Sequence, residues 1–300
     1  MRTKQNPLRK NWILYAMLAP MLLWYLLFCY TPMIGVVTAF QDYSAMKGFF
    51  DSPFVGLKHF KSFFDSEYFM RSLRNTLAIS LTNLLFAFPA PILLAILLNE
   101  LGGVRYKKTV QTIIYMPHFI SVVVICSLVR IFISPSGVIN EVIGFFGVPT
   151  TNFLNDPKYF RGIYVISGIW QNVGWDSIIY IAALAGVDPE LYDAAVVDGA
   201  GRLQRILNVS IPGILPTITI LLILRVGNML SVGWEKIVLL YNPGIYETAD
   251  TISTFVYRRG LVDGRYSFAS AVGLFNSVCN FVLLITADFI SKKLGQSGLF

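Results

Sequence analysis

Long apolar stretches alternate with shorter polar segments along the whole chain. A helix of about 20 apolar residues crosses a hydrocarbon layer of about 30 Å, and six of the stretches reach that length. We therefore predict an all-α polytopic membrane protein with six transmembrane helices in a single domain over residues 1–300. The predicted spans are residues 12–40, 72–98, 109–133, 162–184, 213–240 and 268–290.

The polar segment between the fourth and fifth predicted spans, residues 185–212, has the pattern of two short helices. Asp188 can cap a helix that begins at Pro189, and Gly199 predicts where that helix ends. A second helix is predicted to follow and to end at Pro212, before the fifth span. On this pattern alone, an ordinary amphipathic loop and a docking surface for another protein both remain open.

Composition and charge support the membrane assignment. The chain is 55% hydrophobic and only 14% charged, with a mean hydropathy of +0.62, which is more apolar than a soluble core can bury. The net charge of +7 comes from Lys and Arg spread over loops, without a dense basic stripe, so no nucleic-acid partner is expected. The basic N-terminus predicts that both chain termini are cytoplasmic; its charges are Arg2, Lys4, Arg9 and Lys10.

The sequence lacks the short motifs of common enzymes. It contains no Gly-x-x-x-x-Gly-Lys-Ser/Thr loop for ATP, no His-Glu-x-x-His and no Gly-x-Ser-x-Gly. Its two histidines are far apart, and its three cysteines fall in separate apolar runs. We therefore expect no catalytic residue, metal site or cofactor in this chain.

Charged side chains inside two predicted spans are the candidates for a functional site, because burying a charge in a membrane is costly. Asp176 lies near the middle of the fourth span and Arg225 near the middle of the fifth. At about 100° per residue, the polar residues of the fifth span fall within about a third of the helix circumference. These residues are Arg225, Asn228, Ser231 and Glu235. The alternative is a structural ion pair of Arg225 with Asp176 or Glu235.

Three strings within residues 185–212 stand at a fixed spacing: Asp193-Ala194-Ala195, Asp198-Gly199-Ala200 and Val209-Ser210-Ile211-Pro212. They resemble the signature loop of binding-protein-dependent importer permeases, which reads Glu-Ala-Ala, three residues, Gly, nine residues, Ile, any residue, Leu-Pro. The spacing matches in full, and the three departures from the loop are conservative. The resemblance implies a cytoplasmic coupling helix between spans four and five that docks on an ATPase. It assigns this role to Asp193, Ala194, Ala195, Asp198 and Gly199.

Further strings resemble the carbohydrate-uptake branch of these permeases. In the first two thirds of the chain they are Pro53-Phe54-Val55-Gly56-Leu57, Asn75-Thr76-Leu77 and Trp170-Gln171-Asn172-Val173-Gly174-Trp175. In the last third, two strings resemble the LplB-type permeases for polysaccharide-derived oligosaccharides. They are Gly233-Trp234-Glu235-Lys236 and Glu247-Thr248-Ala249-Asp250-Thr251-Ile252-Ser253-Thr254.

The resemblance implies a translocation subunit of the bacterial plasma membrane that imports oligosaccharides and alternates between inward- and outward-facing states. It implies a second, homologous permease, two ATPase subunits that hold ATP and Mg²⁺, an extracellular solute-binding protein and surrounding lipid. It also implies that the fifth span lines the path, where a sugar could stack on an aromatic ring. The predicted substrate-binding residues are therefore Trp175, Asp176, Arg225, Asn228, Ser231 and Glu235. A non-sugar importer and a secondary transporter are the alternatives.

Overall fold

The computed structural model describes residues 11–299, and its chain divides into two compact units. The first unit is the described part of Met1–Asp65 together with Arg258–Leu274, and the second is Ser66–Tyr257 with the described part of Phe275–Phe300. The basic N-terminal residues that predict the orientation lie outside the described residues. The cytoplasmic location of the termini therefore stays a prediction.

Helices form nearly all of the regular structure between residues 11 and 299, where Gln41 and Phe54 also make an isolated antiparallel bridge. The helices of the first unit are α2 (Trp12–Tyr25), η1 (Leu26–Tyr30), α3 (Thr31–Met33), η2 (Ile34–Phe40), α4 (Lys58–Phe64), η7 (Arg258–Val262) and the start of α17 (Tyr266–Lys293). The second unit begins with α5 (Glu67–Thr82), η3 (Asn83–Ala87), α6 (Pro89–Glu100), α7 (Val104–Tyr115), η4 (Met116–Phe119), α8 (Val122–Phe132), α9 (Val138–Phe145) and α10 (Pro157–Ala185). It continues with α11 (Pro189–Val197), α12 (Arg202–Arg205), η5 (Ile206–Ser210), α13 (Ile211–Gly227), α14 (Trp234–Leu240), η6 (Pro243–Ile245), α15 (Tyr246–Ala249), α16 (Ile252–Tyr257) and the rest of α17.

Four continuous helical segments are long and apolar enough to cross a membrane, and each overlaps one of the predicted spans. They are Trp12–Phe40, Glu67–Glu100, Arg202–Gly227 and Tyr266–Lys293. A fifth candidate consists of Val104–Phe119 and Val122–Phe132, which are bent by 100°. The third predicted span, residues 109–133, is therefore not one continuous helix. Pro117 interrupts the helix there, and the Ser121 hydroxyl then caps the start of α8.

The fourth predicted span corresponds to α10, a helix of 29 residues. It is long enough to cross a membrane, but it is not among the segments that also pass on hydropathy. Its polar residues, including Gln171, Asn172 and Asp176, lower its apolar character. Length and hydropathy therefore support four spans, or five with the bent pair, among the described residues.

The fifth predicted span is also not one helix. α13 ends at Gly227, residues 228–233 form no helix, and α14 starts again at Trp234. Gly227 lies against Leu284 of α17, so closely that a Cβ at this position would clash with the leucine side chain. The prediction of a continuous helix over residues 213–240 is wrong.

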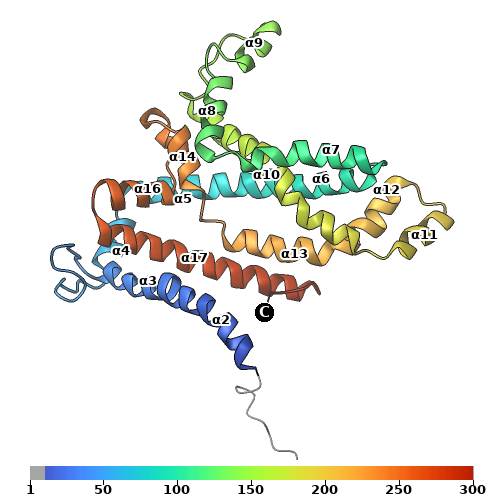
Figure 1. Ribbon diagram of the computed structural model, residues 1–300. Coiled ribbons are helices and arrows are strands. Elements are labelled where there is room, and N and C mark those ends of the chain that lie inside the picture. Colours follow the sequence, from blue (N-terminus) through green and yellow to red (C-terminus); the bar gives the residue numbers. More distant parts are fainter. Residues whose placement is uncertain (1–10, 300) are drawn as a thin grey trace, which may run out of the picture. The chain divides into compact units, whose positions relative to one another are not determined.

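The second unit is built around α10, which packs against α6, α7 and α13 (Figure 1). Buried apolar side chains from α6, α10 and α13 form one core cluster: Ala95, Ile96, Tyr180, Leu184 and Ile214. These contacts fix the relative positions of the three helices.

Gly174 allows α10 to approach α7. A Cβ at this position would collide with the backbone carbonyl of Ile114, so Gly174→Ala is expected to destabilise the protein by about 1–3 kcal/mol. Gly162, on the same helix, has nothing within 4 Å of a built Cβ. Gly162→Ala is therefore expected to be neutral or stabilising by about 0.5–1 kcal/mol. Thermal unfolding of the solubilised protein compares the two variants, and equal losses would contradict the packing argument.

In the first unit, Asp42 fixes the loop after η2 to helix α4. The Lys58 ammonium donates to Asp42 Oδ2 at 2.6 Å, and His59 Nε2 lies 3.0 Å from the other oxygen. The hydrogen bond from Lys58 is the main cause that holds the pKa of the Asp42 carboxyl below its ordinary value, although partial burial opposes it. This exposed contact orients the loop and lies outside the predicted spans.

Candidate functional site

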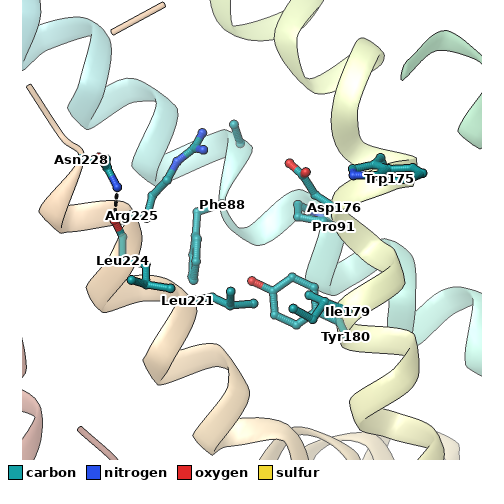
Figure 2. A pocket seen from close by; sticks show the side chains of 11 residues that line it. Phe88, Pro91, Trp175, Asp176, Ile179, Tyr180, Leu221, Leu224, Arg225 and Asn228 are labelled. Carbon is teal, nitrogen blue, oxygen red and sulfur yellow. Dashed lines mark hydrogen bonds between the residues drawn. The ribbon is translucent and has the colours of Figure 1, made fainter. Parts of the chain in front are cut away.

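A cavity of about 410 Å³ opens between η3, α6, α10 and α13. Asp176 points into it from α10 and Arg225 from α13 (Figure 2). The other lining residues are Ala87, Phe88, Pro91, Trp175, Ile179, Tyr180, Leu221, Leu224 and Asn228. Two opposite charges in a mostly apolar wall suit a ligand that presents both polar groups and a hydrophobic face.

Arg225 is the residue around which the cavities of this region meet. It also lines a neighbouring cavity of about 320 Å³, together with Asp176, Tyr164 and Lys236. A third cavity, of about 190 Å³, is lined by Arg225, Asn228 and Ser231 among others. Five of the six predicted substrate residues therefore line this group of cavities, which we call the Arg225 cavities.

The alternative role predicted for Arg225, a structural ion pair, is not found. Within residues 11–299 the structure records no ion pair between Arg225 and either Asp176 or Glu235. Arg225 lies in the last turn of α13, where a positive charge interacts favourably with the helix dipole. Its guanidinium remains available to a ligand in the cavities.

Glu235 is the predicted residue that the structure does not bring to these cavities. We placed it on the stripe by counting turns along one helix, but the helix ends at Gly227. Because α14 begins afresh at Trp234, the side chain that turns inward is that of Lys236. Both residues belong to the string Gly233-Trp234-Glu235-Lys236, which was singled out only for its resemblance to related permeases. Hydropathy alone does not tell which of the two charged side chains faces the cavities.

The break after α13 is held by α17. Asn280 Oδ1 accepts a hydrogen bond from the backbone nitrogen of Leu230 at 2.9 Å, and Asn280 Nδ2 donates to Ser231 Oγ at 2.8 Å. Asn228 Nδ2 donates to the carbonyl of Leu224 at 3.1 Å (Figure 2). The bond from Leu230 satisfies a backbone N–H of the non-helical segment, for which the interior of a membrane offers no water as a partner.

Trp175 does lie at the cavity, but its ring has a neighbour that the sequence did not reveal. His118 stacks on it with ring centroids 4.5 Å apart and planes 3° apart. His118 is held in turn by a 3.1 Å hydrogen bond between its Nδ1 and Asn172 Oδ1. Sequence analysis judged His118 isolated, because the bend between α7 and α8 brings it to α10 over 50 residues away.

The predicted coupling segment has its first helix where the sequence placed it. Asp188 Oδ1 accepts a hydrogen bond from the backbone nitrogen of Glu190 at 3.0 Å, and α11 runs from Pro189 to Val197. Gly199 then adopts a φ of 79°, which a glycine reaches at little cost. Four of the five assigned coupling residues are exposed and Ala195 is half-buried.

The second predicted helix of this segment does not end at Pro212. α12, the π-helical turn η5 and α13 form one continuous segment, Arg202–Gly227. The π-helical turn η5 is wider than an α-helical turn, and it accommodates Pro212, which has no backbone N–H to donate. Tyr192 of α11 is linked to this segment by a 3.0 Å hydrogen bond between its hydroxyl and Ser210 Oγ. The exposed helix α11 is thereby joined directly to the helix that carries Arg225.

Residues 68–296 match the family described as binding-protein-dependent transport system inner membrane component. The chain belongs to this family. Two relatives from Bacillus subtilis (strain 168) are similar to this permease over most of its length. Protein LplB is 46% identical over 97% of this chain and 92% of its own, and the polygalacturonan/rhamnogalacturonan transport system permease protein YteP is 44% identical over 96% and 90%.

Solved structures agree with this assignment. The permease matches a chain of a bacterial ABC transporter involved in the import of the acidic polysaccharide alginate, with a TM-score of 0.89 and 46% identity, over 97% of this chain and 98% of that one. It matches equally well, over 98% of both chains, a bacterial alginate ABC transporter in complex with an alginate pentasaccharide-bound periplasmic protein. The fold of this permease is therefore that of an importer's translocation subunit.

Proposed function

We propose that this permease translocates oligosaccharides through the Arg225 cavities and takes its energy from a separate ATPase that docks on α11. The names of the two relatives at 44–46% identity and the alginate importer support a sugar as the cargo. The lining, which combines charged, amide and aromatic side chains, fits the hydroxyls and apolar faces of a sugar chain.

We further propose six spans, with α10 as the fourth. Its 29 residues give a length of about 44 Å at 1.5 Å per residue, which exceeds the hydrocarbon thickness. Its polar residues line the Arg225 cavities, so they need not face lipid. An even number of spans then returns the C-terminus to the cytoplasmic side, where the basic N-terminus is predicted to lie.

The other proposed partners are supported by an apolar helix that the rest of the chain does not cover and by the solved structures of relatives. The most apolar window of Trp12–Phe40 has none of its residues buried within the chain. Lipid and a second permease subunit are the proposed covering for that helix. The complex of the alginate transporter with a periplasmic protein supports delivery of the sugar by a binding protein. ATP and Mg²⁺ belong on the partner ATPase.

The observation that carries the proposal is that Asp176, Arg225 and Asn228 line one cavity. The test is substrate-stimulated ATP turnover of the assembled complex with its sugar-loaded binding protein. Asn228→Ala is expected to lower the stimulation about 2- to 10-fold, the loss that follows from one hydrogen bond. Glu235→Ala, its matched control outside the cavities, is expected to stay near the wild-type value. An unchanged response of Asn228→Ala would argue against this path.

A further inference from the structure

Lys236 is a buried cation to which the proposed function assigns no role. It lies on α14 and lines the 320 Å³ cavity beside Arg225. The residue is only 9% exposed, and its Nζ has no hydrogen-bond partner. Burying an ammonium without a partner costs several kcal/mol of folding free energy. A ligand group that accepts its hydrogen bonds would therefore be bound favourably.

The packing of α14 fixes Lys236 in this position. Ile237 and Leu240 of the same short helix are fully buried in the core cluster that includes Cys126. The Lys236 ammonium lies over the ring of Tyr164, 5.3 Å from its centroid. This cation–π contact compensates a part of the lost hydration, but it supplies no hydrogen-bond acceptor.

A glycine lies beside the ammonium. A Cβ built on Gly168 of α10 would lie 3.5 Å from Lys236 Nζ, an ordinary van der Waals contact, so this part of α10 passes close to the lysine. Two amides of the same cavity have partners elsewhere: Gln171 Nε2 donates to the carbonyl of Ile120 and Asn172 Nδ2 to that of Gly168. Among the residues that line this cavity, Lys236 is the one with a fully buried side-chain polar atom that has no hydrogen-bond partner.

The charges of this cavity do not balance. Lys236 and Arg225 contribute two positive charges, and Asp176 contributes the one carboxylate among the lining residues. Neither cation forms an ion pair with Asp176 in the part of the chain that the structure describes. One further anionic group would balance the cavity and supply the acceptor that the ammonium lacks.

We propose that Lys236, with Arg225, binds a carboxylate of the transported sugar and thereby selects oligosaccharides that contain uronic acid. This inference rests on the proposed function, since it names the substrate class of the same cavities. A uronate offers a carboxylate for the ammonium and a sugar ring for the neighbouring aromatic side chains. A neutral sugar would leave the lysine unpaired and would be bound less tightly.

The test compares two probes of equal length that differ in charge, tri-galacturonate and its fully methyl-esterified form. Equilibrium binding is measured on the purified complex of permeases and ATPases without the binding protein, so that selection by the binding protein does not enter. The wild type is expected to bind the acid at least about ten-fold more tightly than the ester. Lys236→Gln is expected to reduce this preference to about two-fold or less, whereas Lys236→Arg retains most of it.

Lys158→Gln serves as the matched control, because this lysine is exposed and ion-paired to Asp156 outside the Arg225 cavities. It is expected to keep the wild-type preference. Thermal unfolding identifies variants that fail to fold. If Lys236→Gln does not fold, the test rests on Lys236→Arg, which is expected to retain the preference for the acid. Equal binding of both probes by the wild type, or a full preference in Lys236→Gln, would overturn the proposal. Either result combined with a reduced sugar response of Asn228→Ala would leave the translocation path itself standing.

Discussion

Gly199→Pro is expected to lower sugar uptake at least about ten-fold while the complex still hydrolyses ATP, because coupling between sites is typically a matter of 1–3 kcal/mol. The end of α11 depends on this glycine. Its N–H donates to the carbonyl of Val196 at 3.0 Å, and the N–H of Ala200 donates to that of Ala195 at 2.8 Å. Proline removes the first of these donors and cannot adopt the φ of 79°.

The chain offers a matched control for this substitution. Gly147 ends α9 with the same geometry: its φ is 80°, and its N–H donates to the carbonyl of Gly144 at 2.9 Å. Gly147→Pro should therefore cause a similar local distortion away from the coupling segment and leave the coupling of ATP turnover to uptake intact. Equal uncoupling by both variants, or normal uptake by Gly199→Pro, would remove the docking role of α11.

Asp193 provides a second test of the same surface. The side chain is exposed on α11, so Asp193→Lys changes the charge of the docking face without disturbing packing. A like-charge contact in place of a complementary one is expected to weaken binding of the ATPase to the permease, which copurification measures. Reduced recovery of the ATPase, with the permease still inserted, is the expected result. Unchanged recovery would show that this position does not touch the partner.

Much of the fold could be predicted from the sequence because membrane-spanning helices leave a strong signal. Residues 12–40 are helical throughout, as predicted, and the starts of α11 and α17 fall close to their expected positions. Capping chemistry was equally informative, since Asp188 and Pro189 act locally. These features depend on the residues of one segment, so no knowledge of distant contacts is required.

The parts of the fold that sequence analysis missed depend on contacts between segments. The end of α13 coincides with Gly227, whose neighbour Leu284 is 57 residues further along the chain. Hydropathy continues across residues 228–240, so the break after Gly227 leaves no mark in a window average. Because of the same break, Lys236 faces the cavities in place of the predicted Glu235. Arg225, by contrast, lies before the break, in the last turn of α13, so that counting turns along one helix applies to it.

The positions of Arg225 and α11 suggest how the two ends of the transport cycle communicate. Arg202–Gly227 is one continuous helical segment, with the bond from Tyr192 to Ser210 near its first turns and Arg225 in its last turn. If a partner displaced α11, this continuous segment would carry the displacement toward the cavities. The proposed coupling therefore has a physical route, since α11 and the cavities contact the same helical segment.

Arg225→Ala is accordingly expected to reduce binding of the oligosaccharide about 10- to 100-fold, since a charge-assisted hydrogen bond to the sugar is lost and Asp176 keeps an unbalanced charge. Arg225→Lys should give an intermediate loss, because an ammonium retains the charge but not the planar set of donors. Equilibrium binding to the purified complex measures both variants.

Arg130→Ala is the control for this prediction. Arg130 also lies in the last turn of an apolar helix, α8, but it is absent from the Arg225 cavities. Its loss is expected to leave sugar binding within about two-fold of the wild type, a change of less than 0.5 kcal/mol. If Arg225→Ala bound the oligosaccharide as well as Arg130→Ala does, with both proteins equally stable to heat, the path of the sugar would have to lie elsewhere. A loss confined to Arg225 would place the sugar between α10 and α13, at the far end of the helical segment to which α11 is bonded.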